Sequence, residues 1–373
     1  MFISQFTASN LRALDLITLT PHQNINIILG KNNAGKTSLL EGMYFSSSLK
    51  SFKSVTSSSL IKTGHKSSKL LLNVTKRDDS ISISIEKSIK GPNVVKVNDT
   101  RCSAKDLLLL YPVLALNFGV ENIITGSSES RRSLLDWGSF HVEHTYLNLY
   151  KSFTKVLRQR NSILKKKDTQ NLEYWDDLYI KYGEEIHQKR LDYFNLLNKH
   201  FMDYKSKILE IIPDAYDDIK SSTLSYDCGW DDSLTLKDSI YALRDKDLIL
   251  KHTSAGPHRC DVQFKSNGKT LKDVSSMSTQ IINGLLLVLS QAKVFHVKHN
   301  DMPIILIDDL FFGIDDKNLL LVINLLLDSK AQCFVTAPDL YKAKLEESIT
   351  GNEAIRVYEF KGKDLEVVNC GEQ

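Results

Sequence analysis

The segment Asn24-Ile25-Asn26-Ile27-Ile28-Leu29-Gly30-Lys31-Asn32-Asn33-Ala34-Gly35-Lys36-Thr37 decides the fold. Its first six residues form a mainly apolar run that stops at a glycine, which is typical of a buried strand. Residues 30–37 match the pattern G-x-x-x-x-G-K-T at every position, and residues 38–44 follow with a helical pattern. A strand, a glycine-rich loop and a helix in this order predict a phosphate-binding loop.

The residue types in this loop suit phosphate chemistry. Glycines allow the backbone to approach the phosphates, and the backbone N–H groups then form an anion nest at the start of a helix. Lys36 supplies a point charge to the outer phosphates, and the Thr37 hydroxyl is a ligand for Mg²⁺. The sequence therefore predicts ATP and Mg²⁺ binding by Gly30, Lys31, Asn32, Asn33, Ala34, Gly35, Lys36 and Thr37; the alternative is a Gly/Asn-rich turn without a ligand.

A second apolar run, Ile304-Ile305-Leu306-Ile307, ends in Asp308 and Asp309. A phosphate-binding loop needs a strand that ends in an acid to hold Mg²⁺, usually through water, and Asp308 fits this role. Asp309 lies where ATPases of the ABC class place the catalytic carboxylate that polarises the attacking water. The alternative is a turn at the end of a strand. The two motifs are about 270 residues apart, which predicts a long insertion between them.

The remaining patterns place strands at both ends of the chain and helices in the middle. Residues 81–85 alternate as in a half-buried strand, a Gly91-Pro92-Asn93 turn follows, and residues 331–336 form a third apolar run. Residues 128–215 favour helices. Residues 46–59 are Ser-rich and basic, which predicts a loop or the entry to an exposed strand, and residues 216–245 are acidic and favour irregular structure.

Charge and cysteine content exclude several classes of protein. The five cysteines are scattered without a CxxC pair, which argues against a zinc site or a disulfide framework. The first residues lack the pattern of a signal peptide, and the longest apolar stretch, residues 107–118, is too short to span a bilayer. The sequence thus favours a cytoplasmic protein without a membrane segment. Two stretches, residues 42–77 and 151–167, contain basic residues but no acid; each is either a solvated face or a contact surface for nucleic acid.

Several motifs together resemble the RecF family of SMC-like ATPase heads. The resemblance extends from about residue 9 to residue 340, and its most specific parts are R-R-x-x-L-D, V-L-R-Q-R-N and G-P-H-R. The matching segments are Asn10-Leu11-Arg12, Arg131-Arg132-Ser133-Leu134-Leu135-Asp136, Val156-Leu157-Arg158-Gln159-Arg160-Asn161 and Gly256-Pro257-His258-Arg259.

The resemblance implies an α/β fold: a P-loop ATPase head of the ABC type with a mixed sheet, plus an inserted, mainly helical lobe. We expect the head to comprise residues 1–120 and 248–373, and the helical lobe to comprise residues 121–247. Asn10, Arg12 and Ser276 are implied as further nucleotide-binding residues. The family likeness also implies an ATP-dependent homodimer that binds single-stranded or gapped DNA, acts with RecO and RecR in RecA loading, and supports SOS induction.

The chain departs from the family where ABC dimers complete the nucleotide site. The signature S-x-G-Q corresponds here to Ser276-Met277-Ser278-Thr279, in which both the glycine and the glutamine are replaced; the alternative register places Gln280 at the last position. The family's S-E-L-D corresponds to residues 312–315, of which only Asp315 is kept, and residues 118–122 match their motif weakly. We therefore expect ATP binding with slow hydrolysis or weak dimerisation.

The basic, Ser-rich segment after the first helix is the candidate DNA contact. Lysine charges in such a segment would neutralise phosphates independently of sequence, and the candidates are Lys50, Lys53, Lys62 and Lys66. Arg131, Arg132, His258 and Arg259 are either ligands or internal ion-pair residues. Two other functions stay open: a degenerate paralogue that binds ATP and acts only through partners, and a component of an ATP-dependent nuclease system.

Overall fold

A computed structural model describes residues 1–52, 57–77, 79–117, 123–166, 170–211, 217–311, 314, 316–349 and 351–368. The chain divides into two compact units, and the first combines both ends of the chain, Met1–Asn122 and Ser276–Gln373. The second unit is Ile123–Ser275. The return to the first unit falls at Ser276 and not at residue 248, because residues 257–274 build strands and short helices that pack within the second unit.

One sheet of the first unit is antiparallel and has six strands. Their order is β2-β1-β4-β5-β6-β7, and the expected hairpin at residues 81–97 is present as β5 and β6. Alternate residues of β1 and β4 are buried, so one face of this sheet packs on the core. The strands are β1 (Phe2–Leu11), β2 (Leu14–Leu19), β4 (Ser67–Lys76), β5 (Asp79–Ser88), β6 (Val94–Val97) and β7 (Thr100–Arg101).

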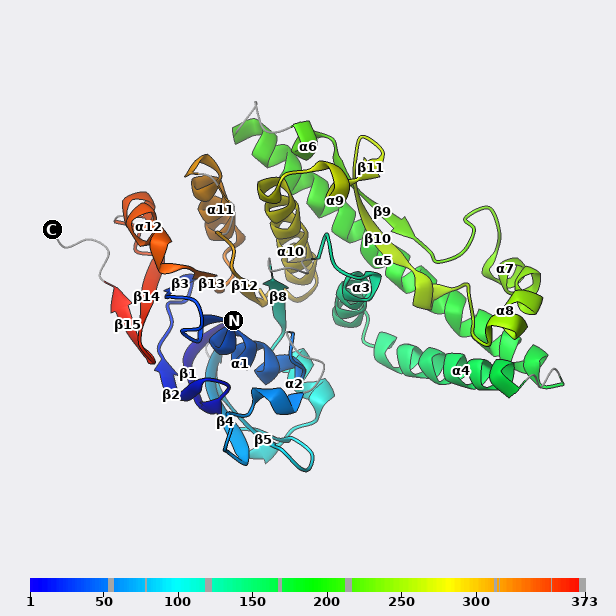
Figure 1. Cartoon of the computed structure of the whole chain (residues 1–373), viewed down its shortest axis with the longest axis horizontal. Helices are drawn as coiled ribbons and strands as arrows, with labels where there is room; N and C mark the ends of the chain where they lie inside the picture. Colours follow the sequence, from blue (N-terminus) through cyan, green and yellow to red (C-terminus); the bar gives the residue numbers. More distant parts are fainter. Residues whose placement is uncertain are drawn as a thin grey trace. The chain divides into compact units, whose positions relative to one another are not determined.

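The other sheet of this unit is mostly parallel, in the order β15-β14-β3-β13-β12-β8. Only β15 runs antiparallel to its neighbour, and every residue of β3, β12 and β13 is buried. The strands lie side by side in Figure 1. Their bounds are β3 (Ile25–Leu29), β8 (Val113–Asn117), β12 (Ile304–Asp308), β13 (Cys333–Ala337), β14 (Ile355–Lys361) and β15 (Asp364–Val368).

Helix α1 (Lys36–Ser48) packs against strands of both sheets and is buried around most of its circumference. It extends through Ser46, Ser47 and Ser48, where the sequence predicted a loop. The prediction was wrong because the hydroxyls have partners: Ser46 donates to Gly42 O at 2.8 Å, and Ser47 donates to Tyr111 O at 2.5 Å. Satisfied hydroxyls remove the usual cost of burying serine in a helix.

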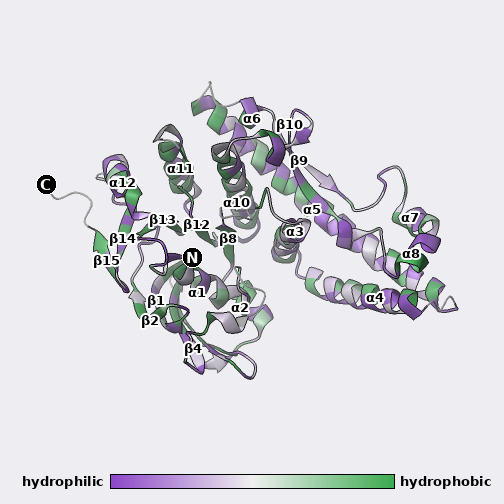
Figure 2. Ribbon diagram, viewed as in Figure 1, coloured by the Kyte–Doolittle hydropathy of each residue, from purple (hydrophilic) through white to green (hydrophobic). Residues whose placement is uncertain are grey.

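Three further helices of the first unit are α10 (Met277–His299), α11 (Asp316–Ser329) and α12 (Lys342–Ile349). By length and composition α10 is apolar enough to cross a membrane, but 78% of its most apolar window is buried inside the protein. Figure 2 shows hydrophobic colouring along much of α10 and α11, as expected for core helices. The short elements of this unit are α2 (Ala104–Leu110), η1 (Ser57–Leu60) and η3 (Asp339–Tyr341).

The second unit is built on three long helices and a three-stranded antiparallel sheet. The helices are α3 (Ser128–Val142), α4 (Tyr146–Lys166) and α5 (Leu172–Ile211), and the sheet order is β11 (Lys269–Thr270), β10 (Asp261–Ser266), β9 (Ser222–Asp227). Short helices complete it: α6 (Asp217–Lys220), α7 (Leu236–Ala242), α8 (Arg244–Leu250), η2 (Pro257–Arg259) and α9 (Leu271–Val274). Residues 217–245 are therefore more regular than the sequence predicted, because β9 finds a partner strand 34 or more residues further along the chain.

Buried arginines join the elements of the second unit. Arg160 on α4 is fully buried and donates at 2.7 Å to both Asp176 and Asp247. Arg190 on α5 forms an ion pair with Asp136 on α3 at 2.7 Å. Each guanidinium group donates to several acceptors at once and so fixes the relative positions of the helices. The local sequence pattern alone does not define these positions.

Candidate nucleotide site

The phosphate-binding loop connects β3 to α1, as the sequence predicted. Gly35 is the N-cap of α1 and has a φ of 115°, in the left-handed region that favours glycine. A Cβ atom at this position would lie 2.7 Å from Leu14 Cδ2. Both backbone geometry and packing therefore require the second glycine of the motif, and the first turn of α1 presents free N–H groups to the loop.

Lys36 points back into its own loop. Its Nζ donates to Gly30 O at 2.5 Å and to Lys31 O at 3.0 Å, and only 7% of the residue is exposed. Burial lowers the pKa of Lys36, and the nearby carboxylates of Asp309, Asp308 and Asp339 partly offset this effect. The lysine is thus a buried cation in a loop shaped for an anion, and phosphate oxygens can replace the carbonyl oxygens as its partners.

Thr37 and Asp308 meet at the carboxyl edge of the parallel sheet. The Thr37 hydroxyl donates to Asp308 Oδ1 at 3.2 Å. The register explains the contact, because β13 pairs with β3 on one side and with β12 on the other, so the ends of the three strands lie along one edge. A carboxylate and a hydroxyl beside a phosphate-binding loop are the oxygen ligands that Mg²⁺ takes together with substrate phosphates.

Thr336, near the end of β13, holds both acids in place, a role that no sequence pattern indicated. Its hydroxyl donates to Asp308 Oδ1 at 2.6 Å and accepts from the Asp309 backbone N at 2.8 Å. The residue is fully buried. Only the strand order β3-β13-β12 reveals this role, since one threonine in an apolar run has no distinctive pattern.

Asp309 turns the chain away from β12. Its φ of 57° lies in the left-handed region, which is uncommon for a residue with a side chain. Asp309 is half-buried, whereas Asp308 is only 2% exposed. The two acids therefore have different surroundings: Asp308 is fixed by two hydroxyls, and Asp309 lies at a sharp turn close enough to act on the Lys36 charge. Asp339 in η3 is a further acid beside Lys36, and no sequence pattern indicated it.

Arg12 is held by an acid from α1. Its Nη2 donates to Glu41 Oε1 at 2.7 Å, and its Nε donates to Glu41 Oε2. Asn10 and Arg12 both have positive φ, at 55° and 48°; Asn10 lies within β1, and Arg12 begins the two-residue turn to β2. The roles of Asn10 and Arg12 as nucleotide ligands stay a prediction. In that prediction, Glu41 orients the Arg12 guanidinium.

Ser276 is exposed and forms the N-cap of α10, where its hydroxyl accepts from Thr279 N at 3.2 Å. The positive end of a 23-residue helix is therefore presented next to this serine. The role of Ser276 toward nucleotide stays a prediction. Asp315 and residues 118–122 lie outside the described residues.

The four predicted DNA-binding lysines differ in their surroundings. Lys50 and Lys66 are exposed. Lys62 forms an ion pair with Asp15, whose pKa falls to about 2 beside Lys363 and Lys62. Because Lys363 shares the same carboxylate, the charge of Lys62 is only partly compensated, which makes it a weaker candidate for a phosphate contact than an unpaired lysine. Lys53 lies outside the described residues.

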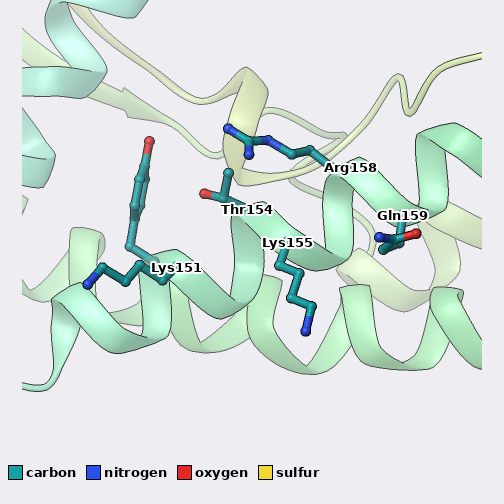
Figure 3. A pocket seen from close by; sticks show the side chains of 6 residues that line it. Lys151, Thr154, Lys155, Arg158 and Gln159 are labelled. Atoms are coloured by element: carbon teal, nitrogen blue, oxygen red, sulfur yellow. The ribbon is translucent and has the colours of Figure 1, made fainter. Parts of the chain in front are cut away.

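The second basic stretch forms one side of α4. Lys151, Lys155 and Arg158 are exposed and line a shallow hollow with a volume of about 370 Å³, together with Tyr150, Thr154 and Gln159 (Figure 3). Arg160 faces the opposite way, into the core, so it is a structural residue and not a surface cation.

Several polar residues of the family motifs in the second unit have internal partners, whereas Arg158 and Arg259 are exposed. Arg131 donates to both oxygens of Asp261, at 2.7 and 2.8 Å, and Arg132 donates to Cys260 O at 2.9 Å. His258 lies 3.0 Å from Thr253 O through Nε2 and 2.9 Å from the Tyr179 hydroxyl through Nδ1. Of the two interpretations left open by the sequence, these contacts favour internal pairing for Arg131, Arg132 and His258.

Three features define the class of this protein: a P-loop between β3 and α1, a strand β12 that ends in Asp308, and a mixed sheet. This class is the P-loop ATPase heads of the ABC type, as predicted. The model of the RecF/RecN/SMC N-terminal domain matches residues 2–362. Among solved structures, the chain is similar to the recombination mediator protein RecF-ATP in the RecFOR pathway, with a TM-score of 0.78 and 23% identity over 99% of this chain and 98% of that one. The Smc head domain of Pyrococcus furiosus is more distant, with a TM-score of 0.56 and 16% identity over 98% and 96% of the two chains.

Curated relatives identify the family more closely. The DNA replication and repair protein RecF of Pseudoalteromonas translucida is 30% identical over 344 residues, covering 90% of this chain and 92% of the relative. RecF of Psychromonas ingrahamii is 30% identical over 339 residues with the same coverage, and RecF of Francisella tularensis is 29% identical over 363 residues, covering 95% and 99%. The chain belongs to the RecF family.

Proposed function

We propose that this protein is a DNA replication and repair factor of the RecF type that binds ATP with Mg²⁺ and uses the bound nucleotide to control its hold on DNA. The observation that carries the proposal is the hydrogen bond from Thr37 to Asp308, which joins the phosphate-binding loop to the acid-tipped strand. A related solved structure is of a RecF-ATP complex, and the curated relatives are replication and repair proteins. These findings support the proposal.

Each residue of the site has a defined task in this scheme. The loop N–H groups and Lys36 bind the phosphates, while Thr37 and Asp308 hold Mg²⁺, the latter usually through water. Thr336 fixes the positions of the Asp308 carboxylate and the Asp309 backbone through its hydroxyl. Asp309 orients and polarises the attacking water during hydrolysis.

The finer proposal is a nucleotide-gated clamp. Two heads close over two ATP molecules, and the Ser276 end of α10 in one head faces the outer phosphate held by the other. The closed homodimer binds single-stranded or gapped DNA and acts with RecO and RecR in RecA loading, in support of SOS induction. Ser278 in place of a glycine keeps the two backbones apart, so hydrolysis is slow.

Light-scattering mass measurement during gel filtration tests the clamp. We expect a monomer without nucleotide and a dimer with ATP and Mg²⁺, and we expect gapped DNA to bind more tightly in the second condition. The matched control is Lys36→Ala, which stays a monomer in both. A mass that does not respond to ATP would instead support a degenerate paralogue that acts only through partners.

A further inference from the structure

The second unit contains a small pocket that is separate from the nucleotide chemistry. It lies between α5 and the loop that follows β9, and its volume is about 470 Å³. Its walls include three aromatic rings, two carboxylates and a thiol, from His187, Tyr226, Trp230, Glu184, Asp232 and Cys228, with leucines at the edge. We call this the Trp230 pocket.

The aromatic rings form a continuous, braced surface. The His187 ring centroid lies 4.8 Å from the Trp230 ring, at an interplanar angle of 65°, and 5.6 Å from the Tyr226 ring. His187 Nδ1 is 3.2 Å from the Tyr226 hydroxyl, and Trp230 Nε1 donates to Leu234 O at 3.2 Å. These contacts fix the ring faces, so a ligand meets a prepared surface.

The charges at the pocket are negative. Glu184 and Asp232 are both exposed, and no lysine or arginine belongs to the residues described as lining the pocket. Burial lowers the pKa of His187, so its ring is neutral at neutral pH. Arg190 is nearby but buried, and its charge is paired with Asp136. A nucleobase could stack on these rings, but the two carboxylates repel the phosphates that accompany it.

We infer that the Trp230 pocket binds an arginine side chain presented by a partner protein. Aromatic faces attract cations, and the flat guanidinium group both stacks on rings and donates paired hydrogen bonds to carboxylates. Asp232 is already oriented, because Cys228 Sγ donates to its Oδ1 at 3.0 Å. The pocket volume lies within the range of small-ligand sites and accommodates one side chain. This site is independent of the proposed nucleotide switch.

Fluorine NMR of protein labelled with 5-fluorotryptophan tests the inference. The chain has three tryptophans, and Trp230→Phe assigns the resonance of interest. Titration with Nα-acetyl-arginine amide, without nucleotide, should shift the Trp230 resonance saturably and leave those of Trp137 and Trp175 unchanged. The isosteric neutral compound Nα-acetyl-citrulline amide should have no effect.

The double variant Glu184→Gln/Asp232→Asn supplies the matched protein control. Both side chains are exposed and keep their shape, so unchanged resonances of Trp137 and Trp175 verify the fold. We expect the apparent affinity for the arginine compound to fall about five-fold or more, equivalent to about 1 kcal/mol. The inference is overturned by an equal response to citrulline, by no saturable shift, by an unaltered affinity in the double variant, or by a Trp230 shift with a short thymidine oligonucleotide.

Discussion

The Thr37 hydroxyl donates a 3.2 Å hydrogen bond to the carboxylate of Asp308, although the two residues are 271 positions apart. Strand pairing brings them together, since β13 lies between the strands that precede each residue. In the proposed function both oxygens would serve as Mg²⁺ ligands, as expected for a hydroxyl and a carboxylate beside a phosphate-binding loop. Of the segment between the two motifs, Ile123–Ser275 forms a separate compact unit.

Thr336→Val should lower the affinity for ATP in the presence of Mg²⁺ and leave the affinity for ATP without the metal unchanged. Valine keeps the shape of threonine but removes the hydroxyl that holds Asp308 and accepts from Asp309 N. An unsatisfied buried partner costs about 1–3 kcal/mol, and a loss of 1.4 kcal/mol in binding is roughly ten-fold in affinity. Calorimetric titration with and without Mg²⁺ measures the difference. Thr18→Val, at an exposed position of β2, is the control, and equal losses with and without Mg²⁺ would refute the role of Thr336.

Ser278→Gly should increase ATP turnover several-fold. The substitution removes the side chain at the position where the family signature has glycine, so the opposing head approaches the phosphate more closely. Steady-state phosphate release in the presence of DNA measures the effect. Ser348→Gly on α12 is a matched control, because it introduces the same helix penalty of about 0.5–1 kcal/mol away from the signature. If turnover stays at the wild-type rate, the serine is not the cause of slow hydrolysis.

The stability of the protein should fall between pH 7.5 and pH 5 partly because of His258. Burial lowers its pKa to about 4, against 6.5 in the unfolded chain. The unfolded state therefore binds more protons than the folded state in this pH window. The contribution of neutral His258 to the free energy of unfolding is fully present above pH 6.5 and is lost as the pH falls toward 4. For this shift the loss at pH 5 is roughly 2 kcal/mol.

Urea denaturation of the wild type and of His258→Gln at the two pH values measures this contribution. Glutamine cannot titrate, so the variant should lose less of its unfolding free energy on acidification, although it is less stable at pH 7.5. A variant whose stability changes with pH as steeply as that of the wild type would show that other groups are responsible.

The double substitution Lys50→Ala/Lys66→Ala should reduce DNA affinity and its salt dependence. If each exposed lysine neutralises one phosphate, the slope of log affinity against log salt falls by about 2 in total. Fluorescence anisotropy with gapped DNA across a salt series measures the slope. Lys62→Ala is the comparison variant: it removes a lysine of the same region whose charge is partly compensated by Asp15, so its slope should fall less than that of the double variant. An unchanged slope in the double variant would place the DNA contact elsewhere, such as the basic side of α4.

The parts of the fold that local sequence defines were predictable. Apolar runs that stop at Gly30, at Asp308 and at Thr336 predicted β3, β12 and β13 to within about two residues, because fully buried strands need no more than a short hydrophobic run. The phosphate-binding loop was equally clear, since its spacing is set by backbone geometry. The ABC-type α/β class followed from these motifs and the family likeness.

The features that depend on distant partners were not predictable from local pattern. Ser46 and Ser47 lie in a helix because Gly42 O and Tyr111 O accept their hydroxyls. Thr336 matters because β13 is inserted between two strands that carry the motifs. The compensation of Lys62 depends on Asp15, 47 residues away in sequence. In each case the deciding partner is fixed by tertiary structure.

The affinity for ATP of the wild type and of Lys36→Ala, measured by calorimetric titration with Mg²⁺, tests the central claim most directly. Lys36 is the buried cation of the phosphate-binding loop, so its removal should weaken binding by about a hundred-fold or more, equivalent to roughly 3 kcal/mol, while thermal unfolding shows an intact fold. Lys69→Ala, at an exposed position on β4, should bind ATP like the wild type. An affinity of Lys36→Ala equal to that of the wild type would contradict the assignment of this loop as the nucleotide site.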